Sequence, residues 1–173
     1  MADVPELPEA KDSYERAIAL SIAILAVILA FVDNTGDNAK TDAIVKTTAA
    51  ANKWSYFQAK SIKGNLAENS AILLGLLTPV DPVAAKAKQE EIRKDVSRYD
   101  GEKQQLMADA QELEKQAAHS MSIDDRSDEA ALVLQISVVV CSIAILVRWK
   151  PIFFSGLTIG VLGIAAAVRA FLS

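Results

Sequence analysis

Few side chains of this 173-residue chain are of the types that usually catalyse reactions or bind metals. The single histidine, His119, and the single cysteine, Cys141, exclude two-histidine metal motifs and multi-cysteine metal sites. His119 is typical of a surface group near a helix end, and Cys141 lies in an apolar stretch where it acts as a small apolar residue. Carboxylates are numerous, and the candidates for a catalytic pair are Glu90, Glu91, Asp109, Glu112 and Glu114.

A catalytic carboxylate pair needs a cleft that shifts a pKa, and a thin helical element does not supply one. The sequence contains no phosphate-binding loop, nucleophile elbow or kinase pattern. We therefore expect a protein that is not an enzyme, with no catalytic residues, cofactor or metal and no small-molecule substrate.

Hydrophobicity and charge are both high and must be segregated along the chain. Hydrophobic residues make up 51%, charged residues 23%, and the mean hydropathy is +0.22. The net charge of −4 gives no indication of nucleic-acid binding.

Three stretches hold most of the apolar residues and are apolar on all sides: residues 17–32, 130–147 and 151–172. A helix that spans a bilayer needs about 20 apolar residues. The second and third stretches meet this length, and the first approaches it with help from Tyr14 and its flanking turn. We predict three transmembrane helices, the first an uncleaved anchor because its leader, residues 1–16, is more acidic than basic.

The third predicted span carries small residues on one helical face: Gly156, Gly160, Gly163 and Ala167. Small residues allow two helices in lipid to approach closely. This row predicts a tight helix–helix contact, either within the subunit or between subunits. Residues 148–150 leave room only for a tight connection, and Pro151 suits the first turn of the helix that follows.

The polar stretch 33–129 predicts a long helical hairpin. The Asx- and Gly-rich segment 33–38 predicts a break, after which the first arm covers about 38–77. Prolines at 79 and 82 predict the turn, and the second arm covers about 83–118. The fold class expected is thus all-α, an integral membrane protein with three transmembrane helices and a coiled-coil-like hairpin outside the membrane.

Both arms carry apolar stripes at helical spacing. In the second arm the spacing alternates between four and three, which is typical of a heptad seam: Ala85, Gln89, Ile92, Val96, Tyr99, Lys103, Leu106, Ala110, Leu113 and Ala117. The first arm has a looser stripe: Ile44, Ala51, Trp54, Ile62, Leu66, Leu73 and Leu77. A single hairpin buries little surface, so we expect it to pack against the same hairpin of a neighbouring subunit.

Residues 51–63 (ANKWSYFQAKSIK) resemble a signature of a bacterial membrane-protein family defined as domain of unknown function 4337. The order of leader, span, signature, charged helix with Tyr99 and two closing spans is also similar over most of the chain. The resemblance implies a multi-pass protein of the bacterial inner membrane and brings no activity with it. Three glycines, at 64, 75 and 101, interrupt the arms.

The signature segment permits two interpretations. Its aromatic and basic residues form a docking surface with Gln58 as a polar contact, or its aromatic residues hold the two arms together. The candidate residues for partner binding or self-association are Trp54, Tyr56, Phe57, Gln58, Lys60, Lys63, Ile92, Val96, Tyr99, Leu106 and Leu113.

The function expected is a non-enzymatic membrane scaffold or accessory subunit, which contacts membrane lipid and forms a homo-oligomer or joins a larger membrane complex. The alternative is a small channel or transport-complex subunit lined by Gln135 and the serines of the spans. Arg148 and Lys150 favour a cytoplasmic N-terminus and a periplasmic hairpin.

Overall fold

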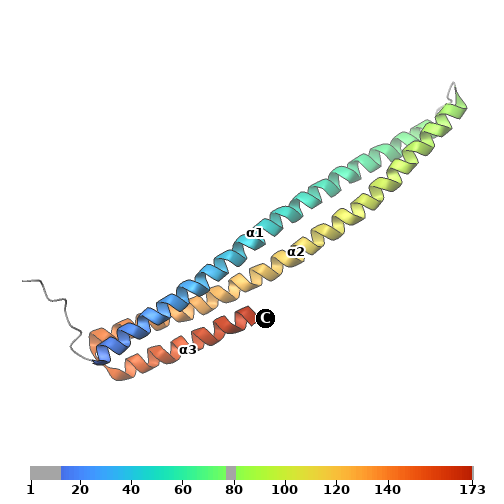
Figure 1. Cartoon of the computed structure of the whole chain (residues 1–173). Coiled ribbons are helices and arrows are strands. Elements are labelled where there is room, and N and C mark those ends of the chain that lie inside the picture. Colours follow the sequence, from blue (N-terminus) through green and yellow to red (C-terminus); the bar gives the residue numbers. More distant parts are fainter. Residues whose placement is uncertain (1–12, 77–80, 173) are drawn as a thin grey trace, which may run out of the picture. The chain divides into compact units, whose positions relative to one another are not determined.

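The structure, a computed structural model, describes residues 13–76 and 81–172, which form three α-helices and no strand (Figure 1). Helix α1 covers Ser13–Leu76, α2 covers Pro82–Val147 and α3 covers Lys150–Leu172. The predicted all-α class is confirmed. Most of the predicted leader (residues 1–12) and of the predicted turn (residues 77–80) lies outside the described residues.

The ends of α2 follow from local chemistry. Asp81 Oδ1 accepts hydrogen bonds from the backbone N–H groups of Val83 (2.9 Å) and Ala84 (3.0 Å), so Asp81 caps the helix that Pro82 begins. Arg148 follows the last residue of α2 with a φ of 52°, a left-handed conformation that ends the helix. The predicted tight connection before α3 is present.

The predicted break at residues 33–38 is wrong, because α1 continues through it. The Thr35 hydroxyl donates to the Phe31 carbonyl at 2.8 Å, and Gly36 is buried. A Cβ at Gly36 would lie 3.0 Å from the Ser127 Cβ, so this glycine serves a close approach of α1 and α2. Asn, Asp and Gly each cost a helix about 1 kcal/mol or less, which the packing around Val32 and Gly36 outweighs.

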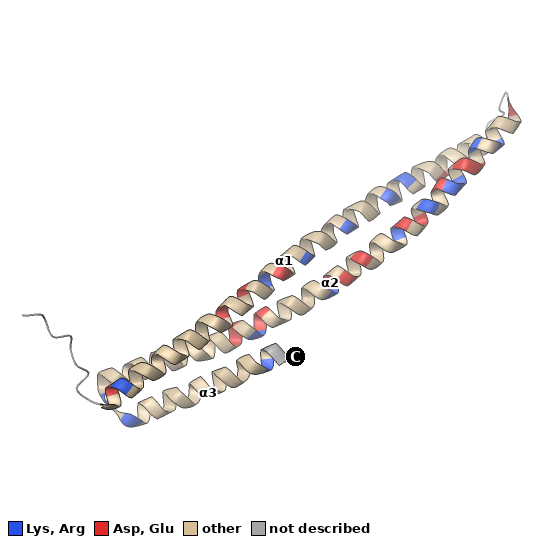
Figure 2. Ribbon diagram, in the orientation of Figure 1, with Lys and Arg blue, Asp and Glu red and all other residues tan. Residues whose placement is uncertain are grey.

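Contacts divide the chain into two units. Unit 1 contains residues 1–41 and 120–173, and unit 2 contains residues 42–119. Unit 1 combines the first part of α1, the last part of α2 and α3, whereas in unit 2 α1 and α2 lie side by side and run antiparallel (Figure 1). Charged residues follow both helices of unit 2, whereas most of unit 1 is uncharged (Figure 2).

The three helices of unit 1 meet around a narrow core. Its largest fully buried apolar side chains are Ile18, Val32 and Leu134. The predicted row on α3 lies on the buried face of that helix: Gly156, Gly160, Gly163 and Ala167. Its three glycines pack against α2, and Gly160 also lies against Leu25 of α1. The close contact is therefore made within the chain.

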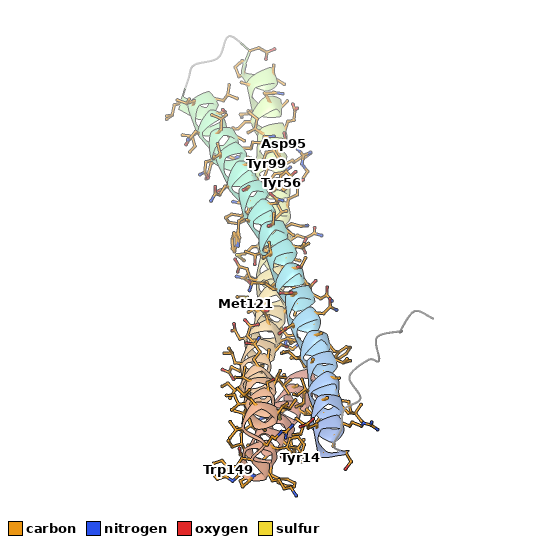
Figure 3. All side chains as sticks on the ribbon, turned by 90° about the vertical axis from the view of Figure 1, so that its left-hand side faces the viewer. Tyr14, Tyr56, Asp95, Tyr99, Met121 and Trp149 are labelled. Atoms are coloured by element: carbon orange, nitrogen blue, oxygen red, sulfur yellow. The ribbon has the colours of Figure 1, made fainter. Side chains whose placement is uncertain are left out.

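The outer surface of unit 1 carries the larger apolar side chains. Those exposed on α1 are Leu20, Ile24, Val27 and Phe31; on α2, Leu132, Ile136, Val139, Ile143, Leu146 and Val147; and on α3, Phe154, Val161, Leu162 and Val168. Tyr14 and Trp149 lie at one end of this unit (Figure 3). All three helices contain a segment long and apolar enough to cross a membrane.

The packing of α3 predicts opposite effects of one substitution at two glycines. A Cβ at Gly163 would lie 2.9 Å from Cγ of the fully buried Leu134, so Gly163→Ala should lower the stability of unit 1 by about 1–3 kcal/mol. Gly101 has nothing within 4 Å of an added Cβ, so Gly101→Ala should stabilise α2 by up to about 1 kcal/mol. Thermal unfolding in detergent, followed by circular dichroism, measures both. Equal changes in melting temperature would contradict the close packing.

Candidate functional site

Segment 52–63 of α1 is joined to α2 within unit 2 by three polar pairs, which we call the cross-arm ladder. Each pair combines a donor on α1 with a carboxylate on α2, which makes the contacts charge-assisted. The pairs are Lys53 Nζ with Asp109 Oδ2 at 2.7 Å, Trp54 Nε1 with Glu114 Oε1 at 2.7 Å, and Lys60 with Glu102.

The ladder sets the register of the two arms. Lys53 and Lys60 are seven residues apart on α1, and their partners Asp109 and Glu102 are seven residues apart on α2 in the opposite direction. A shift of either arm by one turn breaks both ion pairs at once. Nearer the turn, Gln89 Nε2 donates a 2.9 Å hydrogen bond to the backbone carbonyl of Ala71 and continues the same register.

Lys60 lies at the most charged point of the ladder. Its Nζ is 5.1 Å from the centre of the Tyr99 ring, and Arg98 lies 5.2 Å from the same ring. The hydrogen bond from Lys60, together with the positive charges of Lys60, Arg98 and Lys63, lowers the pKa of Glu102 below its ordinary value. Glu102 therefore stays ionised to a lower pH than an ordinary glutamate, and its pair with Lys60 is retained to that lower pH.

The aromatic residues of the signature segment divide between the inside and the outside of the hairpin. The Trp54 and Phe57 rings are in edge-to-face contact at 5.5 Å, and both side chains are half-buried. Tyr56 is 64% exposed, and Gln58 and Lys63 are also exposed. Tyr56 and Tyr99 are labelled on their two helices in Figure 3. Trp54, Phe57 and Lys60 therefore hold the arms together. Tyr56, Gln58 and Lys63 are accessible to a partner.

The seam expected on α2 is occupied within the chain. All ten of its residues, from Ala85 to Ala117, are buried or half-buried in the pairing with α1. Five of the residues expected to serve partner binding or self-association thus lie in the contact between the two arms: Ile92, Val96, Tyr99, Leu106 and Leu113.

Most of the apolar stripe described on the first arm lies on the face of α1 away from α2, whereas its Trp54 is half-buried and bonded to Glu114. Ile44, Ile62, Leu66 and Leu73 are 59–67% exposed, and Leu77 lies outside the described residues. The face of α1 that meets α2 consists of smaller and basic residues at the same alternating spacing: Ala43, Lys46, Ala50, Lys53, Phe57, Lys60, Gly64, Ala67, Ala71 and Leu74. Hydrophobicity favours the other face, and the seven-residue spacing of Lys46, Lys53 and Lys60 is the sequence signal that could have identified this one.

Sequence reasoning also missed a polar layer in unit 1. Asp124 is 2% exposed, its Oδ2 lies 3.5 Å from Lys40 Nζ, and its Oδ1 accepts no hydrogen bond from the described residues. Ser120 and Ser127 are buried on the same face of α2. Ser120, Asp124 and Ser127 continue the spacing of the seam beyond Ala117, so extending the heptad count along α2 finds this layer.

The polar residues of the predicted spans do not converge on one point. Ser137 is buried, and its hydroxyl donates to the Gly156 carbonyl at 2.7 Å. Ser142, Ser155 and Thr158 donate to carbonyls of their own helices at 2.8 Å, and Gln135 is exposed. Each of these hydroxyl groups thus finds its hydrogen-bond acceptor in a backbone carbonyl of the apolar segments.

The residues considered for chemistry remain apart. His119 is exposed, Cys141 is buried in the core of unit 1, and the candidate carboxylates do not form a metal-binding cluster within the described residues. Two of these carboxylates, Asp109 and Glu114, belong to the cross-arm ladder.

The fold defines an all-α protein with two helical units and three helices apolar enough to cross a membrane. The chain matches the family model described as domain of unknown function (DUF4337) over residues 14–173, and it belongs to that family. The resemblance found in the sequence is thus confirmed. No curated protein and no solved structure matches the chain.

The ladder predicts that exchanging the charges of one pair restores stability. Lys53→Glu alone should destabilise the pairing of the arms by about 1 kcal/mol or less, because both groups of the pair are partly exposed. Adding Asp109→Lys should recover most of the loss. Thermal unfolding at low ionic strength measures the effect, with Lys86→Glu on α2 as the control. A double variant no more stable than Lys53→Glu alone contradicts this register.

Proposed function

We propose that the protein is a non-enzymatic integral membrane scaffold or accessory subunit, which crosses the bacterial inner membrane with unit 1 and presents unit 2 for self-assembly or for binding a partner. The observation that carries the proposal is the distribution of side chains in unit 1. Its core combines Ile18, Val32 and Leu134 with glycines, alanines and Ser137, whereas its surface carries many large aliphatic and aromatic residues. In water such a surface favours aggregation, whereas lipid solvates it.

The ends of unit 1 agree with placement across a bilayer. Tyr14 and Trp149 lie at one end, where amphipathic rings suit the headgroup region (Figure 3). At this end Arg148 pairs with Glu15 at 2.7 Å, and Lys150 lies 5.7 Å from the centre of the Tyr14 ring. The charged groups of the connection are therefore satisfied close to the surface of the apolar bundle.

Unit 2 supports a role in interaction. It is a two-helix element with ion pairs across its arms, and its exposed side chains include Tyr56, Gln58 and Lys63 from the signature segment. A hairpin of this kind offers two long helical faces for contact with other helices.

The proposal predicts that one substitution has different effects at two exposed valines of α2. Val139 is 57% exposed in unit 1, and Val83 is 79% exposed in unit 2. A lysine in the centre of a span costs about 2.5–3.5 kcal/mol, so Val139→Lys should sharply reduce the protein that remains in the membrane after alkaline carbonate washing. Val83→Lys should leave that fraction unchanged. Release of the unmodified protein by carbonate without detergent contradicts the proposal.

The orientation proposed is a cytoplasmic N-terminus with unit 2 in the periplasm, because Arg16, Arg148 and Lys150 flank the spans on one side. A single cysteine placed at exposed Ala87 in a Cys141→Ala background should react with an impermeant maleimide in cells whose outer membrane alone has been permeabilised. Labelling only after lysis of the inner membrane contradicts this orientation.

A further inference from the structure

Helix α1 carries a second apolar face in unit 2, on the side away from α2. Its residues are spaced alternately by three and four: Ala59, Ile62, Leu66, Asn69, Leu73 and Leu76. We call this set the outer stripe. All six residues are exposed, and Ile62, Leu66 and Leu76 are 67%, 67% and 77% exposed.

The spacing of the outer stripe identifies the kind of surface that covers it. Alternation by three and four over two and a half heptads is the pattern of a helix that packs along another helix. The inner face of α1 already follows this pattern toward α2 with alanine, glycine and lysine. The larger aliphatic residues of the helix thus lie on the face that has no neighbour within the described chain.

We propose that the outer stripe pairs with the outer stripe of a second copy of this chain, parallel and in register. The proposal rests on the proposed function, because two copies inserted alike in one membrane present their hairpins on the same side. Residue 42 follows unit 1 directly in the chain, so α1 begins unit 2 at the same residue in both copies. Membrane anchoring also raises the effective concentration of one stripe near the other.

The residues beside the outer stripe are complementary in this arrangement. In a parallel pair, a residue at one edge faces the residue five positions further along the other copy. Gln58 then faces Lys63 of the second copy, and Asn65 faces Ser70, so amides meet an ammonium group and a hydroxyl oxygen. No pair of like charges is brought together at these positions.

Asn69 selects the register. In the parallel arrangement it lies beside Asn69 of the second copy, where the two amides hydrogen-bond each other, and a shift by one heptad places an amide against Ile62 or Leu76. A single polar residue in an apolar seam specifies register and oligomeric state in this way, at some cost in stability.

The area is sufficient for a specific contact. The outer stripe together with Ile72, which is 53% exposed at its edge, removes on the order of 1,000 Å² from water when two copies pair. This value lies at the lower limit for a specific interface between proteins, and confinement to one membrane lowers the affinity that is required.

Cysteine crosslinking in native membranes tests the proposal. In a Cys141→Ala background, Asn69→Cys should form an oxidation-dependent disulfide dimer of twice the chain mass, and Ala87→Cys on α2, which is also exposed, should not. Equal crosslinking at both positions, its absence at 69, or a product containing a different protein would overturn the proposal.

A second pair of variants measures the same contact without crosslinking. Leu66→Asp should shift the detergent-solubilised full chain from dimer to monomer in multi-angle light scattering, while Val83→Asp leaves it dimeric. Leu66 is exposed, so circular dichroism should remain unchanged in both variants. A dimer that persists in Leu66→Asp overturns the proposal. A monomeric chain that resists carbonate extraction refutes only this pairing, whereas a chain released by carbonate refutes the proposed function.

Discussion

The alternating four- and three-residue spacing of the buried face of α2 is the constraint on which both units depend. Buried or half-buried residues follow this spacing without interruption from Ala85 to Ile145. Such a repeat keeps one face of a helix toward its neighbour over its full length. What changes along α2 is the chemistry of that face. In unit 2 it is aliphatic with Tyr99 and Lys103 among its members, around Asp124 it is polar, and from Leu134 onward it is apolar.

The two units have opposite distributions of residue size and polarity. In unit 2, ion pairs and the Trp54 hydrogen bond lie at the edge of the contact between the arms, where water reaches one side of them. In unit 1, glycines allow α3 to approach α2 so closely that an added methyl group at Gly156 or Gly163 would meet atoms at 2.7–2.9 Å. Close packing of this kind is what holds helices together in lipid, so it agrees with the membrane placement proposed for this unit.

In unit 2 the small and basic residues of α1 face α2. Alanine, glycine and the stems of lysine allow α2 to approach closely, and Lys53 and Lys60 extend their charges to acids on the facing helix. The aliphatic residues of the same helix are left on the opposite face. A helix with two faces at heptad spacing is suited to an assembly larger than a hairpin, which is the physical basis for proposing a second copy at the outer stripe.

The sequence by itself determined the helical class, the three apolar segments, the start of α2 after Asp81 and the seam from Ala85 to Ala117. These features depend on composition, local capping and periodicity, all of which act over a few residues. Tertiary structure decided that α1 continues through residues 33–38 and that its lysine and alanine face, not its leucine face, meets α2. Contacts such as Gly36 with Ser127 and Lys53 with Asp109 join residues far apart in the chain, so no local pattern contains them.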